Sequence, residues 1–252
     1  MLTKAQRRVR LWREIIYDTR DGVSDETAQA RLRLLQRWEK DAWAYLTGVD
    51  LDGRPIIWTT DELDEEKPIK PFPGHRPYLE HITRQLWAYR LITLDKVRQM
   101  YATTLCALNI DWYCSFVEER EVFVSRVTEE SAVKLINDKI RVTHTRKPAW
   151  LQAALPMDDK PQKIITYLHT NSQVTGVAQN FAASGGRGPT GSIVMVDEAA
   201  FQDQFPAIYT AVLPMTGRLW AISTANVANP GALLFRKLIR EGRPGLSLGE
   251  QG

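Results

Sequence analysis

A short apolar run that ends in two adjacent acids constrains the fold of this 252-residue chain more than any other feature. Residues 193–196 have the pattern of a buried strand, and Asp197 and Glu198 follow it directly. Open α/β sheets bind ligands beyond the carboxyl ends of their strands, so both carboxylates are expected at a binding edge. Asp197 is placed to hold Mg²⁺, directly or through water, and Glu198 to polarise an attacking water. The pattern is typical of the Walker B motif of nucleotide-hydrolysing proteins, although ordinary strands also end in charged turns.

Strand and helix patterns alternate after residue 90, which predicts an α/β fold with a mostly parallel sheet and helices on both faces. The expected strands are 91–94, 121–125, 163–168, 173–177, 193–196 and 218–222. The expected helices are 103–116, 129–141 and 232–240. The strands at 163–168 and 173–177 could form a hairpin.

The first part of the chain has a different character. Residues 3–46 have the periodicity of helices, with a helix start at Ser24. The acidic and then proline-rich stretch 59–73 indicates a linker or an ordered surface loop. We therefore expect a helical N-terminal segment over residues 1–66 and an α/β domain over residues 67–252.

Composition excludes several other classes of protein. A net charge of +3 gives no strong bulk attraction to nucleic acid. No apolar run approaches the roughly 20 residues that span a bilayer, and no secretory signal follows Met1, so we expect no membrane association. Cys106 and Cys114 lie in an apolar helical pattern and are expected as buried free thiols, which fits a reducing cytoplasm. The four histidines lack ligand spacing, so no zinc site is proposed.

A candidate phosphate-binding loop lies between the strand at 91–94 and the helix at 103–116. The amino end of a helix offers free N–H groups to phosphates, and Thr103 stands where such loops place their Mg²⁺-binding hydroxyl. The loop departs from the usual Gly-Lys-Ser/Thr ending, because Tyr101 and Ala102 replace the glycine and the lysine. Another positively charged side chain must then bind the phosphates in place of this lysine.

This loop resembles the nucleotide-binding loop of the large terminase subunit, the ATPase that packages DNA into tailed-phage capsids. In that family the loop commonly reads Arg-Gln-x-Gly-Lys-Ser/Thr-Thr, and the matching positions here are Arg98, Gln99, Met100, Thr103 and Thr104. Some terminases carry the lysine at the opposite end of the loop, where Lys96 stands. The resemblance implies that Lys96 is the phosphate-binding lysine, with Arg98 as a second candidate cation. It also implies that residues 98–104 bind the nucleotide. On the residues alone, Lys96 could be a solvated charge at the end of a strand.

Two further segments resemble terminases. Arg187 lies in a glycine-rich loop eleven residues before Glu198, where several packaging ATPases place an arginine that reaches a neighbouring subunit. The strand at 218–222 runs into Ser223 and Thr224, where terminases carry a coupling motif whose hydroxyls sense the γ-phosphate. Without the resemblance, Arg187 could be a surface arginine in a turn, and Ser223 and Thr224 an ordinary strand end.

The resemblance covers about residues 70–240 and implies a P-loop ATPase domain that uses ATP and Mg²⁺. The implied catalytic residues are Lys96, Arg187 and Glu198, and the implied metal ligands are Thr103 and Asp197. The implied task is to drive double-stranded DNA into the procapsid, in the cytoplasm of a bacterial host. The implied partners are that DNA, the portal protein, a small terminase subunit and further copies of this chain in a ring.

Three other expectations complete this interpretation. Large terminases usually continue into a nuclease domain, and the residues after Arg240 are too few for one, so no nuclease activity is expected.

One rival function is that of another P-loop DNA motor such as a helicase, which should show further motifs and a second RecA-like domain. The other rival is a degenerate or truncated prophage remnant without ATPase activity. Tyr101 and Ala102 favour the remnant, and Glu198 argues against it, since a pure binder has little need of a water-activating acid.

Overall fold

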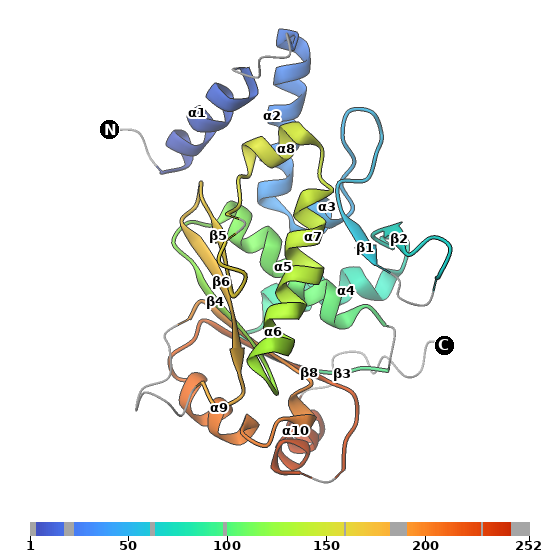
Figure 1. The fold of residues 1–252 in the computed structure, drawn as a ribbon, viewed down its shortest axis with the longest axis vertical. Coiled ribbons are helices and arrows are strands. Elements are labelled where there is room, and N and C mark those ends of the chain that lie inside the picture. The colour runs from blue at the N-terminus through green and yellow to red at the C-terminus, as the bar shows by residue number, and fades with distance from the viewer. Residues whose placement is uncertain are drawn as a thin grey trace.

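The computed structural model describes residues 4–17, 23–60, 64–97, 100–158, 160–181, 191–227 and 229–242 (Figure 1). The helices are α1 (Lys4–Tyr17), α2 (Asp25–Lys40), α3 (Ala42–Leu46), α4 (Pro77–Ala88), α5 (Ala102–Phe116), α6 (Glu129–Ile136), the π-helical η1 (Asn137–Arg141), α7 (Val142–Thr145), α8 (Ala149–Ala154), the 3₁₀ turn η2 (Ala199–Phe201), α9 (Phe205–Val212) and α10 (Pro230–Glu241). The strands are β1 (Trp58–Thr60), β2 (Ile69–Pro71), β3 (Leu91–Asp95), β4 (Glu121–Arg126), β5 (Ile164–Tyr167), β6 (Ser172–Ala178), β7 (Ile193–Asp197) and β8 (Arg218–Ser223).

Six of these strands form the main sheet, in the order β3-β8-β7-β4-β6-β5. All neighbours in it are parallel except β5, which pairs antiparallel with β6, so the two strands form the hairpin that the sequence left open. The predicted α/β class with a mostly parallel sheet is confirmed. The strand before the candidate loop (β3), the strand before Ser223-Thr224 (β8) and the acid-tipped strand (β7) are direct neighbours. Their carboxyl ends therefore meet at one edge of the sheet.

Helices cover both faces of this sheet, and the alternation of side chains along β7 shows how. Ile193 and Met195 belong to a core cluster that also contains residues of α5 and of the N-terminal helices. Val194 and Val196 belong to a second cluster, built with α9 and α10 on the opposite side (Figure 1). Successive side chains of a strand point to opposite faces, so a strand buried on both faces must be apolar throughout. The run at 193–196 satisfies this requirement, and each side chain is fully buried.

The N-terminal helices pack directly against α5. Trp12 and Trp38 are fully buried in the same cluster as Leu105, and Trp112 of α5 donates a hydrogen bond to the carbonyl of Trp38 at 2.7 Å. Ser24 caps α2 as expected, because its hydroxyl accepts a hydrogen bond from the Thr27 N–H. Within the stretch expected as a linker or surface loop, β1 and β2 pair antiparallel. The boundary at residue 66 stays a prediction, but packing is continuous across it.

Several elements differ from the sequence-based expectation. Helices α4, α8 and α9 are not among the expected elements, and α4 and α9 carry proline in their first turns, at Pro77 and Pro206. Proline fits the first turn of a helix because the N–H it lacks would be unpaired there. The prolines before α4 indicate a loop when the sequence is considered alone, and the start of this helix is therefore missed. The helix predicted at 129–141 continues through a π-helical stretch and α7 to Thr145.

A buried polar network joins the N-terminal helices to α5 and to β5. The Lys147 ammonium lies 2.8 Å from Asp111 Oδ2, and both side chains are fully buried. Tyr45 donates its hydroxyl to Asp111 Oδ2 at 2.8 Å, and Tyr167 donates to Asp111 Oδ1 at 2.9 Å. Burial alone would raise the pKa of Asp111, but the charge and hydrogen bond of Lys147 hold it below its usual value. Asp111 therefore stays charged inside the core.

His144, beside this network, makes stability depend on pH. Burial lowers its pKa from 6.5 to about 4, and the Lys147 charge acts in the same direction. Below pH 6.5 the unfolded chain takes up a proton that the folded chain refuses. The free energy of unfolding should therefore fall as pH drops from 6.5 to 5, by up to about 1.4 kcal/mol per pH unit from this group. Denaturant titrations of the parent and of His144→Gln should show a smaller pH slope in the variant. The exposed His75→Gln variant should keep the parent slope, and a His144→Gln slope equal to the parent would contradict this account.

Both cysteines are buried free thiols, as expected. Burial raises the pKa of Cys106 and of Cys114, so both stay protonated at neutral pH. Within the described part of the chain, no helix has the length and apolar character needed to cross a membrane.

Candidate nucleotide site

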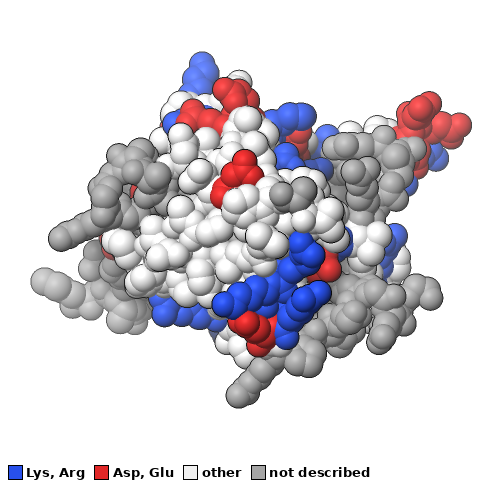
Figure 2. All heavy atoms as spheres, turned by 90° about the horizontal axis from the view of Figure 1, so that it is seen from below, with Lys and Arg blue, Asp and Glu red and all other residues white. Residues whose placement is uncertain are grey.

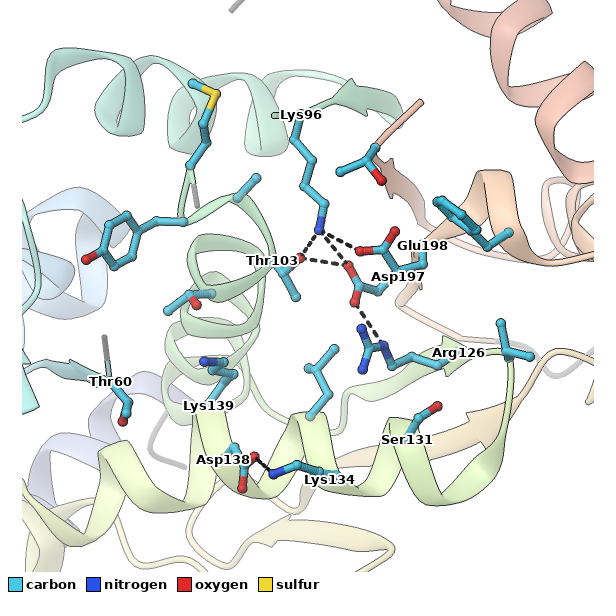
Figure 3. A pocket seen from close by; sticks show the side chains of 18 of the residues that line it. Thr60, Lys96, Thr103, Arg126, Ser131, Lys134, Asp138, Lys139, Asp197 and Glu198 are labelled. Carbon is cyan, nitrogen blue, oxygen red and sulfur yellow. Dashed lines mark hydrogen bonds and ion pairs between the residues drawn. The ribbon is translucent and has the colours of Figure 1, made fainter. Parts of the chain in front are cut away.

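Four side chains predicted from the sequence converge at the carboxyl edge of the sheet (Figure 3). The Lys96 ammonium donates to Thr103 Oγ1 at 2.6 Å, and the Thr103 hydroxyl donates to Asp197 Oδ1 at 2.7 Å. Lys96 Nζ also lies 3.2 Å from Glu198 Oε1 and 3.5 Å from Asp197 Oδ1. The cation, the hydroxyl and both acids therefore form one contact network, although Lys96 and Asp197 are 101 positions apart in the sequence.

The ends of parallel strands and of one helix position these groups. Lys96 directly follows β3, and its backbone N–H donates to the Ser223 carbonyl at the end of β8 at 2.9 Å. Thr103 lies in the first turn of α5, where helix N–H groups face outward. Asp197 ends β7 and is fully buried. Glu198 adopts the left-handed conformation, with φ 57°, which turns the chain sharply and leaves its carboxylate beside Lys96. Such strained residues concentrate at functional sites.

Tyr101, the residue that replaces the glycine of a regular phosphate loop, precedes α5 with φ 54° and ψ 6°. This is the left-handed region, which glycine adopts without steric cost and a bulky residue rarely adopts. The loop therefore keeps a backbone conformation suited to glycine with tyrosine in place. The Arg76 guanidinium carbon lies 5.2 Å from the centroid of the Tyr101 ring, and Arg76 donates to the Tyr78 hydroxyl at 3.2 Å. Arg76 and Tyr101 both line the cleft, and their contact holds the Tyr101 ring in place beside the strained backbone.

Ser223 and Thr224 take different positions. The Ser223 side chain is buried, and its hydroxyl accepts a hydrogen bond from the Ala200 N–H at 3.1 Å. Its carbonyl accepts the Lys96 N–H, so Ser223 ties β8 both to the candidate loop and to the turn after Glu198. Thr224 lines the cleft. A sensing role for a hydroxyl at this strand end therefore fits Thr224, while Ser223 fits a linking role.

Two residues of the site did not emerge from the sequence. Gln202 is buried, and its side-chain amide donates to the carbonyls of Asp197 at 2.8 Å and Ser125 at 3.2 Å, which ties together the ends of β7 and β4. Arg126 Nε lies 3.0 Å from Asp197 Oδ2. Arg126 is the last residue of β4, which lies next to β7, so the residue could be predicted only if the strand order were known.

The donor set fits a magnesium ion. Thr103 and Asp197 offer a hydroxyl and a carboxylate oxygen 2.7 Å apart, and Mg²⁺ prefers oxygen ligands. Asp197 Oδ2 is buried, and no N–H or O–H among the described residues is aligned to hydrogen-bond it, although Arg126 Nε lies 3.0 Å away. Within the described ranges, no group of three or more His, Cys, Asp or Glu side chains is arranged around a common metal position. A single carboxylate suits Mg²⁺ bound together with substrate phosphates.

These groups line a cleft with a volume of about 1580 Å³. Typical ligand pockets have volumes of about 300–1,000 Å³, so this cleft is larger. One wall comes from the loop and first turn of α5, with Met100, Tyr101, Ala102, Thr103 and Thr104. The facing wall comes from α6 and η1, with Ser131, Lys134, Asp138 and Lys139 (Figure 3). The remaining predicted site residues, Arg98, Gln99 and Arg187, lie outside the described residues.

The fold is similar to that of solved structures of phage proteins, whereas no family model and no curated protein matches the sequence. The large terminase of bacteriophage HK97 matches with a TM-score of 0.56 at 13% identity, over 80% of this chain. A variant of the large terminase ATPase domain of Thermus phage P74-26 matches with a TM-score of 0.50 at 15% identity, over 67% of this chain and 73% of that domain. This chain spans 41% of the HK97 protein. The likeness confirms the resemblance at the level of fold: this chain has the fold of a phage large-terminase ATPase domain.

Proposed function

We propose that this chain binds ATP with Mg²⁺ at the carboxyl edge of its sheet and hydrolyses it. The observation that carries the proposal is the contact network of Lys96, Thr103, Asp197 and Glu198 beside the amino end of α5. It contains a cation for phosphate charge, two oxygen ligands for a metal and a second acid. Phosphoryl transfer is catalysed almost entirely by such positioning and charge stabilisation.

Each residue has a defined task in this proposal. Lys96 moves its ammonium from the acids to the β- and γ-phosphates, and the N–H groups at the start of α5 bind phosphate oxygens. Thr103 and Asp197 hold Mg²⁺, which neutralises phosphate charge when bound. Glu198 orients a water molecule and accepts its proton. Thr224, which lines the same cleft, would respond to the terminal phosphate.

The wider role is a proposal that rests on the fold. We infer that the chain is the motor domain of a terminase that drives double-stranded DNA into a procapsid, in a ring of copies on a portal protein, with a small terminase subunit, in the bacterial host cytoplasm. Arg187 would then serve a neighbouring copy. Figure 2 shows one group of Lys and Arg side chains, with acidic side chains among them, on the largely uncharged face that bears α9 and α10, and clustered positive charge attracts a phosphate backbone. Stimulation of ATP hydrolysis by duplex DNA, lost at high salt, would support this role. A rate indifferent to DNA would contradict it.

Steady-state ATP hydrolysis by Lys96→Ala tests the proposed enzyme. With Mg²⁺ present the parent chain should hydrolyse ATP, and Lys96→Ala should lower the rate by about 10²-fold or more, the usual effect of removing one preorganised group that stabilises transition-state charge. Lys163→Ala is the matched control, because Lys163 forms an exposed ion pair with Glu129 and should leave the rate unchanged. A parent inactive even at concentrations that favour a ring would support the degenerate alternative. Activity that survives in Lys96→Ala would reject the assignment of this lysine.

A double-mutant cycle tests whether Arg76 supports the loop through Tyr101. Arg76→Ala should weaken ATP binding about fivefold, equivalent to a cation–π contact of about 1 kcal/mol, because the strained Tyr101 conformation loses its support. In a Tyr101→Gly background the same change should have little effect, since glycine needs no support in the left-handed region. Titration calorimetry of the four variants measures the coupling. Equal losses in both backgrounds would mean that Arg76 acts independently of Tyr101.

A further inference from the structure

Arg126 belongs to the cleft although no sequence motif marked it. It is the last residue of β4, which runs parallel to β7 with Ser125 opposite Val196. This register brings Arg126 beside Asp197, and its guanidinium points toward that carboxylate (Figure 3). The side chain is 31% exposed and lines the cleft, whereas Asp197 is fully buried. Arg126 can therefore move within the cleft while Asp197 stays in place.

Charges in the cleft balance around Asp197. Its Oδ1 contacts the Thr103 hydroxyl and the Lys96 ammonium, and its Oδ2 faces Arg126. Lys96 also pairs with Glu198, so two cations offset two acids. A divalent cation entering alone would meet two positive side chains at its carboxylate ligand. A polyphosphate entering with the metal offers both cations a new anionic partner.

The contact between Arg126 and Asp197 is suited to exchange. Nε lies 3.0 Å from Oδ2, yet its N–H is not aligned for a hydrogen bond. Charge alone holds this pair, so little hydrogen-bond energy is lost when the guanidinium leaves. A guanidinium binds phosphate with two parallel N–H donors, a stronger and more directional contact.

We propose that Arg126 makes metal binding at Asp197 conditional on a bound nucleoside triphosphate. Arg126 holds Asp197 Oδ2 until the phosphates offer its guanidinium a better partner, and it then releases the carboxylate to Mg²⁺ and adds a second cation beside Lys96. This inference rests on the proposed function and assigns a positioning residue to that same site. It predicts opposite effects of one substitution on two affinities, whereas a merely structural role would weaken both.

The test measures metal and nucleotide affinity separately on the full chain. Mn²⁺, which is visible by electron paramagnetic resonance, replaces Mg²⁺ as the probe and is titrated without nucleotide. Removing Arg126 as Arg126→Ala should tighten Mn²⁺ binding about tenfold, because one repelling charge is gone. The same variant should weaken ATP binding at saturating Mg²⁺ about tenfold, measured by calorimetry. Arg126→Lys keeps the charge without the paired donors, so it should keep the weak Mn²⁺ binding of the parent and lose part of the ATP affinity.

Arg84→Ala is the control, because Arg84 pairs with Glu80 on the exposed surface of α4 and should change neither affinity. Melting temperatures of all variants identify any loss of folding, and Arg126→Lys supplies the test if Arg126→Ala fails to fold. ATP binding by the parent with no gain of Mn²⁺ affinity in Arg126→Ala would overturn this inference and leave the proposed function standing. A parent that binds no ATP would reject the proposed function, and with it the triphosphate partner that this inference requires.

Discussion

Replacing Glu198 with glutamine should lower kcat for ATP hydrolysis by about 10²- to 10⁴-fold, the range for loss of a general base. Glutamine keeps the size of the side chain but cannot accept a proton from water. ATP affinity should stay equal or become tighter, because the substitution removes a negative charge 3.2 Å from the Lys96 ammonium. Single-turnover hydrolysis and calorimetric ATP binding separate the two effects.

Glu129→Gln is the matched control for Glu198→Gln. Glu129 is an exposed glutamate at the start of α6, paired with Lys163 at 2.6 Å, and it should leave kcat unchanged. A Glu198→Gln variant that hydrolyses ATP at the parent rate would show that another group activates water. A variant that loses ATP binding as well would place Glu198 in binding rather than in proton transfer.

Replacing Asp111 with alanine should lower the free energy of unfolding by about 3–5 kcal/mol, the usual cost of leaving one partner of a buried ion pair alone. The Lys147 ammonium would stay buried without its carboxylate, and the hydroxyls of Tyr45 and Tyr167 would lose their acceptor. Urea titration of the purified chain measures the loss. Because the network joins α3, α5 and β5, the loss should appear as one cooperative transition at lower urea.

Tyr167→Phe provides the graded comparison for Asp111→Ala. It removes one hydroxyl and keeps the Lys147–Asp111 pair, so it should cost about 1 kcal/mol, the usual net contribution of one hydrogen bond. Equal effects of Asp111→Ala and Tyr167→Phe would mean that the ion pair contributes little to stability. An Asp111→Ala chain as stable as the parent would contradict a structural role for the network.

Much of the site could be predicted because its residues lie at the ends of strongly patterned elements. The run at 193–196 is apolar at every position, since both faces of β7 are covered, and that pattern identifies a central strand without knowledge of its neighbours. Asp197 is the last residue of β7, and Glu198 and Lys96 directly follow β7 and β3. In a parallel sheet the carboxyl ends of the strands share one edge. The fold class, together with the position of these residues at strand ends, therefore predicts that their side chains meet.

The remaining features depend on information that a single sequence does not carry. Arg126 belongs to the site because β4 neighbours β7, and strand order cannot be read from local patterns. The left-handed conformation of Tyr101 was not expected, because bulky residues rarely adopt it and its support comes from Arg76, 25 positions earlier. Tertiary packing therefore decides how a tyrosine at this position can keep a backbone conformation suited to glycine.

A crystal structure of the chain with Mg²⁺ and a non-hydrolysable ATP analogue tests the central claim most directly. The account predicts phosphates at the amino end of α5 within hydrogen-bond distance of Lys96 Nζ, and the metal on Thr103 and Asp197, at the carboxyl edge of the sheet. Glu198 should face the terminal phosphate, with room for one water molecule between them. A nucleotide bound elsewhere, or phosphates in this cleft without contact to Lys96, would contradict it.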